Sequence, residues 1–158
     1  MRSKLTVLAA ITVLAASFLF VNVSVHPVTS VNAQAVKCTD AKFLTQVATD
    51  FTDISKIQAT DAVASAHSLL IIAGVRQKYE DMTDVPDTCL SVQYQTVSFM
   101  ANLSDLFSLA IASQVDAAGA ADYAKAATAQ VERVKKLGAA MTDLIKNGEG
   151  DMAATPAS

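Results

Sequence analysis

The sequence predicts an all-α protein, an antiparallel up-down-up-down four-helix bundle with one disulfide, preceded by a signal peptide. Three observations predict it. Along most of residues 39–147, apolar side chains recur at steps of three and four, which is the spacing of one helix face. A charge-free apolar stretch stands near the N-terminus, and two cysteines precede or begin the first and third expected helices. With 52% apolar and 17% charged residues, the chain has the composition of a folded domain.

Residues 1–35 have the three-part design of a secretory signal peptide. Arg2 and Lys4 give a positive start, residues 5–21 carry no charge, and Ala33 and Ala35 form a small-residue cleavage site. An uncleaved anchor formed by residues 5–21 is the alternative, because such a run reaches the lower limit of about 17 residues that span a bilayer. Both readings place the domain outside the cytoplasm, secreted or anchored, with a membrane as partner only if the leader is retained.

The first helix is expected over residues 39–59. Its apolar stripe is formed by Leu44, Val47, Phe51 and Ile54. Thr60 and Asp61 are a good N-cap and first-turn pair for a second helix, which runs to about Met82. The middle of this second helix, residues 69–75, is apolar on every side, which favours a helix segment buried all round over a buried strand.

Residues 83–88 contain Pro86 and form the clearest break in the domain, because proline has no amide hydrogen to donate within a helix. From there a third helix runs to about Val115 and carries two neighbouring apolar stripes. A weaker break at Gly119 precedes a fourth helix, which ends near Asn147. The expected domain is therefore residues 36–147, and residues 148–158 are expected to be a disordered tail.

Cys38 and Cys89 provide a check on this topology. Cys38 precedes the first helix and Cys89 lies in the first turn of the third, and in an up-down-up-down bundle these two helix starts lie at the same end. An exported chain with this pair is expected to form one disulfide. A redox or metal pair is the alternative, although redox dithiols usually sit in a C-x-x-C motif and a zinc site needs further ligands.

The charge balance argues against nucleic acid as a partner. All fifteen acidic residues follow position 35, together with ten of the twelve basic ones, so the exported domain carries a net charge of −5. Nucleic-acid-binding proteins concentrate basic residues on one surface, and the basic residues around Arg133 instead resemble a solvated helix face.

No catalytic constellation can be assembled from the sequence, so a non-enzymatic role is expected. His67 is the sole histidine after position 35, and no nucleophile motif surrounds it. A His67–Met100 pair across the bundle is a remote candidate for ligating haem, and we expect no cofactor. Acidic residues around the loop at residues 80–87 lack the EF-hand spacing, so no metal site is expected.

The second and third helices carry more apolar surface than one bundle seam requires. Burial in the core is the simplest explanation, and an apolar interface or an internal pocket are the alternatives. The residues expected to line such an interface or pocket are Leu69, Ile72, Phe99, Leu103 and Phe107. We therefore expect an exported binding or structural module for a protein or surface partner, or for a second copy of the chain. The alternative is a carrier of a small apolar ligand or cofactor inside the bundle.

Overall fold

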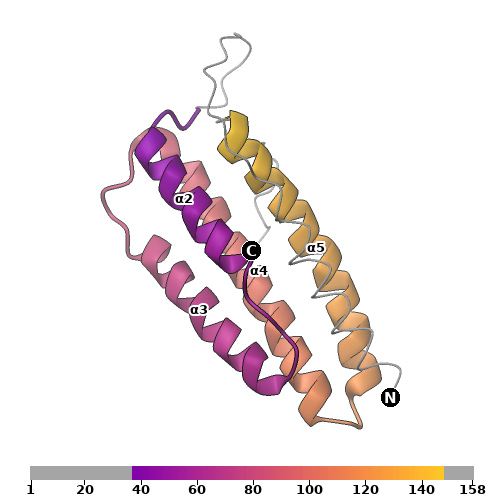
Figure 1. Ribbon diagram of the computed structural model, residues 1–158. Helices are drawn as coiled ribbons and strands as arrows, with labels where there is room; N and C mark the ends of the chain where they lie inside the picture. Colours follow the sequence, from indigo (N-terminus) through magenta and orange to yellow (C-terminus); the bar gives the residue numbers. More distant parts are fainter. Residues whose placement is uncertain (1–36, 148–158) are drawn as a thin grey trace.

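The computed structural model describes residues 37–147, which are all-helical and contain no strand in that range. The elements, shown in Figure 1, are α2 (Ala41–Ile54), α3 (Ala62–Glu80), the 3-10 helix η1 (Asp87–Cys89), α4 (Leu90–Val115) and α5 (Ala120–Asn147). The all-α prediction with four helices is confirmed. The expected signal peptide or anchor (1–35) and the expected tail (148–158) lie outside the described residues.

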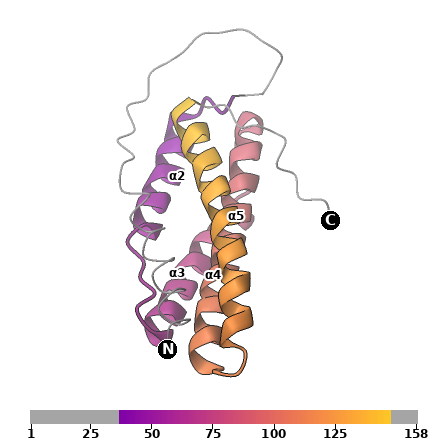
Figure 2. The same ribbon diagram turned by 90° about the vertical axis from the view of Figure 1, so that its right-hand side faces the viewer.

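Helix α4 is the central element of the domain. It packs along α3 on one side and along α5 on the other, while α2 contacts both α3 and α5, an arrangement that Figures 1 and 2 show from two directions. The largest fully buried side chains of α4 point into this shared core: Thr96, Phe99, Met100, Leu106, Phe107 and Val92. Its two apolar stripes are therefore explained by its two helical neighbours.

The first helix is shorter than the sequence predicted. α2 starts at Ala41 behind an Asp40 cap that accepts the Phe43 N–H at 2.8 Å, and it ends at Ile54 instead of residue 59. The Ser55 hydroxyl donates to the carbonyl of Thr52 at 2.6 Å, and the following amides bond three residues back. Side-chain bonds of this kind compete with the helical ladder, so the apolar periodicity continues beyond the point where the helix stops.

The second helix begins one residue later than expected. Asp61, not Thr60, is the N-cap: its backbone is extended and its carboxylate accepts the Ala64 N–H at 2.8 Å. The end of α3 is tied to the start of α4 by Gln93, whose amide donates to the carbonyls of Tyr79 (2.6 Å) and Met82 (2.9 Å). Gln93 therefore holds the end of α3 and the beginning of the turn, while the Cys89 N–H donates to the Pro86 carbonyl (2.7 Å) at its end.

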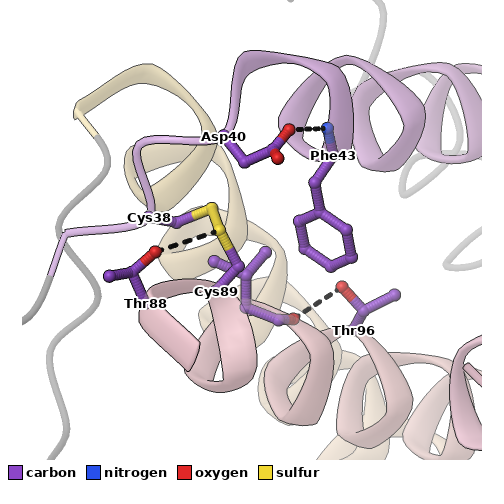
Figure 3. The surroundings of a disulfide bond; sticks show 7 residues. Cys38, Asp40, Phe43, Thr88, Cys89 and Thr96 are labelled. Atoms are coloured by element: carbon purple, nitrogen blue, oxygen red, sulfur yellow. Dashed lines mark hydrogen bonds between the residues drawn. A yellow bond between two sulfur atoms is a disulfide. The ribbon is translucent and has the colours of Figure 1, made fainter. Parts of the chain in front are cut away.

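The predicted disulfide is present. Cys38 and Cys89 are joined with a Cα–Cα distance of 4.4 Å across 51 residues of sequence, and both are buried. Figure 3 shows the bond between the segment that precedes α2 and the last residue of η1, directly before α4, with Phe43 projecting from α2 beside it. The two helix starts therefore meet, as the sequence predicted.

The predicted break before the fourth helix is built around Asp116. Its carboxylate accepts the N–H groups of Ala118 (3.0 Å) and Gly119 (3.1 Å) and the Tyr123 hydroxyl (3.2 Å). These bonds, first that of Gly119 and then that of Tyr123, hold the pKa of Asp116 below its usual value. A Cβ at Gly119 would lie 2.7 Å from both the Asp116 carboxylate and the Tyr123 ring, so a larger residue here would displace these two side chains.

One prediction about α3 is wrong. Residues 69–75 form a helix, as expected, but they are not buried on every side, since Leu70 is 73% exposed and Ile71 38% exposed. Among the described elements, α4 and α2 cover only one side of α3. The opposite side of this apolar segment consequently faces outwards.

Candidate functional site

The side of α3 that points away from the core is its most unusual surface. We call it the outer face of α3 and define it as seven exposed residues: Val63, Ala66, His67, Leu70, Ala73, Gly74 and Gln77. Their spacing of three and four residues places them on one stripe of the helix. The buried residues of α3, which are Ser65, Ser68, Ile72 and Tyr79, lie on the opposite side.

The exposure of this face is large and its charge is nil. Val63 is 80% exposed and Leu70 is 73% exposed, although neither side chain gains anything from contact with water. Residues 62–75 contain no Asp, Glu, Lys or Arg, and His67 is their single titratable side chain. A solvated helix face normally carries charged residues, so this stripe differs from the exposed sides of α2 and α5.

Gly74 adds a second peculiarity to the outer face of α3. It lies in the interior of the helix, where glycine is less favourable than alanine by about 1 kcal/mol. A Cβ built on Gly74 meets nothing within 4 Å, so no neighbour inside the chain requires its small size. Position 74 therefore faces open space on the outer face of α3.

A groove adjoins this face, between α3 and the end of α2. Its volume is about 330 Å³, which is at the small end of the range of ligand pockets. Apolar and polar side chains line it: Asp53, Lys56, Ile57, Gln58, Ala64, His67, Ser68 and Ile71. His67 therefore belongs to both the groove and the outer face, and the Asp53–Lys56 ion pair (2.8 Å) stands at the rim.

The groove holds a serine, a histidine and an aspartate, but not in the order of a catalytic triad. The Ser68 hydroxyl is buried and donates to the Gln58 carbonyl at 2.7 Å, while the Asp53 carboxylate pairs with Lys56. Among residues 37–147, neither group is hydrogen-bonded to His67. A nucleophile needs a base within hydrogen-bond reach, so these three side chains do not form an activated set.

The structure separates His67 from Met100. His67 is exposed at the groove, whereas Met100 is fully buried in the core of α4. Within residues 37–147, no group of three or more His, Cys, Asp or Glu side chains is placed to hold a metal ion.

The residues expected to line an apolar interface or pocket lie in the core. Ile72, Phe99, Leu103 and Phe107 are buried in one cluster, and Leu69 is partly buried against it. On α3 the exposed large apolar residues are instead Val63, Leu70 and Ile71, which the sequence analysis did not single out. The sequence feature that could have indicated them is the absence of Asp, Glu, Lys and Arg over residues 62–75. This feature identifies the helix as unusual but does not show which of its sides faces outwards.

A polar cluster that the sequence analysis also missed fixes the other flank of α3. Asp50 of α2 accepts the Tyr79 hydroxyl and the Lys78 ammonium, each at 2.7 Å. Burial, and next the bond to Asp50, raise the pKa of Tyr79 far above its usual value. Asp50 and Tyr79 are 29 residues apart, so no local motif could have paired them.

One described helical segment, Asp87–Val115, is long and apolar enough by length and composition to cross a membrane. This is weak evidence, because the core helix of a soluble protein passes the same test. The inward side of α4 is fully packed between α3 and α5.

The chain matches no protein-family model, no curated protein and no solved structure.

Proposed function

We propose that this chain is an exported, non-enzymatic binding module that uses the outer face of α3 to hold a protein or surface partner outside the cytoplasm. In this proposal residues 1–35 direct export, and residues 36–147 form an antiparallel up-down-up-down bundle. The Cys38–Cys89 disulfide supports the location, because such bonds persist in oxidising compartments. The leader's positive start and apolar run support the export step.

The observation that carries the binding role is the exposure of Val63 (80%) and Leu70 (73%) on a charge-free stripe. Contiguous apolar surface on a small protein commonly marks a site of interaction. Covering each of these side chains would contribute about 1.5–3 kcal/mol for complete burial of a Val or Leu. Because the stripe contains no Asp, Glu, Lys or Arg, a partner can cover it without desolvating a carboxylate, an ammonium or a guanidinium group.

The composition of the face defines the kind of partner. An apolar helix or strand from another polypeptide complements it, and so does an uncharged apolar surface. Nucleic acid does not, because the exported domain is acidic and the stripe offers no lysine or arginine for phosphates.

Photochemical cross-linking in the exporting cell tests the proposal. A photoreactive residue is placed at Leu70 of the full-length chain, and the matched control places it at Val115, which is 71% exposed on α4. We expect a discrete adduct from position 70 and none from position 115. The outcome that contradicts the proposal is the absence of an adduct from position 70 in protein recovered outside the cytoplasm.

The same experiment tests export. The recovered chain is expected to lack the leader, with cleavage after Ala33 or Ala35, and to have a mass two hydrogens below that of the dithiol form. A chain that stays in the cytoplasm with two free thiols would remove the proposed location and with it the binding role outside the cell.

A carrier of a small ligand is the second candidate function, and the groove beside His67 favours it. Ile57, Ile71 and Ala64 provide apolar walls, while Lys56 at the rim can face a polar end of the ligand. Native mass spectrometry of the exported protein tests this function: bound mass that is lost on activation, and is absent in an Ile71→Glu variant, supports a carrier.

A further inference from the structure

We propose that the Cys38–Cys89 disulfide is a redox switch for the docking of α2: the helix is docked in the oxidised chain and detached in the dithiol chain, while α3, α4 and α5 stay packed in both. The switch does not involve the outer face of α3, so it goes beyond the proposed binding role. Three features of α2 support it: its weak tendency to form a helix, its limited attachment to the other helices, and the disulfide at its start.

α2 has a weak intrinsic tendency to form a helix. It has 14 residues, and isolated helices shorter than about 12–15 residues are marginal in water. Thr45, Thr49 and Thr52 are exposed, and the hydroxyl of each donates back to the carbonyl four residues earlier, at 2.7, 2.9 and 2.8 Å. Threonine is a poorer helix former than alanine, and such back-bonded hydroxyls slightly destabilise a helix.

The acidic residues of α2 lie near its C-terminal end. Residues 51–54, its last turn, contain Asp53 and no lysine or arginine. Carboxylates at this end of a helix oppose its dipole. The Asp50 carboxylate is compensated by the Lys78 ammonium of α3 at 2.7 Å, a contact that exists only while α2 is docked. The helical structure of α2 therefore depends on docking.

α3, α4 and α5 hold one another by contacts that do not include α2. α3 and α5 each pack along α4, whereas α2 approaches α3 and α5 closely only over short stretches (Figure 1). Gln93 ties the start of α4 to the end of α3, and Gln130 of α5 donates to the Asn102 carbonyl of α4 at 2.8 Å. Detachment of α2 leaves these contacts in place.

The contacts of docked α2 are few enough for the disulfide to decide the balance. Phe43 packs edge-on to Tyr79 with ring centroids 6.2 Å apart, and Phe51 packs on Phe99 with centroids 4.8 Å apart. Ordering the backbone of α2 opposes these contacts. The disulfide closes a loop across 51 residues and so restricts the undocked chain, which favours docking by about a thousandfold.

The place of the disulfide suits this role. Cys38 lies two residues before the Asp40 cap of α2, and Cys89 lies directly before α4, so the bond holds the start of α2 at the start of α4 (Figure 3). In the docked state both cysteines are buried, at 4% and 0% exposure, which shields the bond from a dissolved thiol. The switch therefore operates when the chain is first oxidised, and the folded domain keeps it closed.

Closure requires a disulfide-bearing oxidant, which oxidising compartments outside the cytoplasm supply. A thiolate of one cysteine attacks a sulfur of the oxidant and forms a mixed disulfide. The thiolate of the other cysteine then attacks the protein sulfur of that bond, forms Cys38–Cys89 and releases the oxidant as a dithiol. The protein loses two protons and two electrons, and the oxidant gains them. The compartment in which α2 docks thus rests on the proposed export.

Docking of α2 also completes the groove beside His67. Side chains from residues 53–58, at and after the end of α2, form one wall of the groove, and side chains from residues 64–71 of α3 form the other. A chain with α2 detached loses the contribution of α2 to the first wall. The oxidised chain alone therefore presents the complete groove.

Hydrogen exchange measured by mass spectrometry tests the switch without any substitution. One sample of the exported chain is reduced with dithiothreitol in urea and returned to native buffer with the reductant. The control passes through the same steps without reductant and keeps its disulfide. In the dithiol chain we expect the amides of α2 to exchange at least about a hundredfold faster than in the control, and at least about tenfold faster than those of α4.

Strengthening α2 tests the assigned cause. In the dithiol form of the combined variant Thr45→Ala, Thr49→Ala, Thr52→Ala, we expect the amides of α2 to exchange about tenfold more slowly than in the dithiol wild type, because alanine favours the helix. Ser108→Ala removes a back-bonded hydroxyl from an exposed position of α4 and is the matched control, with no expected effect on α2. Unchanged exchange of α2 in the combined variant would overturn the assigned cause.

Two results of the exchange experiment would overturn the switch. If α2 remains as protected in the dithiol chain as in the control, its side-chain contacts alone hold it. If α2 and α4 lose protection together, the disulfide holds the whole domain and not α2. The experiment uses the purified chain without a partner, so either result leaves the proposed binding role intact. That role fails by a different result, the absence of a photo-adduct from position 70.

Discussion

The inner face of α3 buries polar side chains and its outer face exposes apolar ones, although apolar side chains are expected in the core and polar ones at the surface. The inner face buries two serines and a tyrosine, whereas the outer face exposes valine and leucine. The Ser65 hydroxyl is buried among residues 37–147 with no hydrogen-bond partner, and the Tyr79 hydroxyl reaches Asp50. Apolar content therefore does not distinguish the core side of this helix from its free side.

The comparison teaches what places a helix face in the core. Ile72 is fully buried on the inner face, and α3 packs along α4, while the Ser68 hydroxyl donates to the Gln58 carbonyl. The outer face also contains apolar residues, but no described helix meets it. Fit to a neighbour, and not hydrophobicity alone, selects the buried side of α3.

The same substitution, made once on the inner face and once on the outer face of α3, tests this difference most strongly. Ile72→Asp places a charge at a fully buried site, and we expect a loss of more than about 5 kcal/mol, which unfolds a domain of ordinary stability. Leu70→Asp, two residues away on the outer face, is expected to change the free energy of unfolding by less than about 0.5 kcal/mol. Urea titration followed by circular dichroism compares the two variants. Similar losses would mean that the two faces are equivalent.

Removing the disulfide tests whether the inner face depends on the attachment of α2. The double variant Cys38→Ala, Cys89→Ala opens a loop of 51 residues, and we expect the free energy of unfolding to fall by about 4 kcal/mol. The outer face of α3 lies away from this bond, so any association through it is expected to persist while the variant is folded. Denaturant titration of the oxidised wild type and the variant gives the difference. A loss below about 1 kcal/mol would show that α2 is held by its side-chain contacts alone.

Tyr79→Phe tests the polar anchor of the inner face. Phenylalanine keeps the ring that packs edge-on to Phe43, but it removes the 2.7 Å bond to Asp50, and we expect a loss of about 2 kcal/mol, as for a bond to a charged group. Tyr94→Phe is the matched control, because Tyr94 is 73% exposed.

The dependence of stability on pH above 10 is expected to distinguish Tyr79→Phe from the wild type. The folded state raises the pKa of Tyr79 by burial and by its bond to Asp50, so the folded chain retains this proton while the unfolded chain loses it above its ordinary pKa of about 10. Stability is therefore expected to fall as the pH rises past 10, and to fall less steeply in Tyr79→Phe. Equal slopes in the two proteins would contradict the assigned role.

Much of the fold follows from local signals in the sequence. The four helices, the loop at Pro86 and the disulfide could be predicted because periodicity, proline and cysteine placement act locally or through topology. The end of α2 could not, because Ser55 stops the helix through its own side chain while the apolar spacing continues. The cap at Asp61 differs by one residue for a similar reason, since both Thr60 and Asp61 are capping residues.

The candidate site was harder to predict. Residues 69–75 are apolar in every direction, so periodicity contains no information on which side meets α4. The residues that the sequence predicted for an interface or pocket, such as Ile72 of α3 and Phe99 of α4, lie on the inward sides of their helices, in the core. Only the three-dimensional structure distinguishes Leu70 and Val63 as the exposed apolar residues of a binding face.

Gly74→Ala is expected to have the smallest effect on stability, and it tests whether position 74 on the outer face of α3 is free of contacts within the chain. Alanine is expected to raise the free energy of unfolding by about 1 kcal/mol, because it favours the helix and its Cβ meets no neighbour within 4 Å. Ala73 is exposed and adjacent to Gly74, so Ala73→Gly is the matched control, and it is expected to lower the free energy of unfolding by a similar amount. Thermal unfolding at low concentration measures both. Destabilisation by Gly74→Ala would mean that position 74 is already covered within the chain, and the outer face of α3 would then be no free surface.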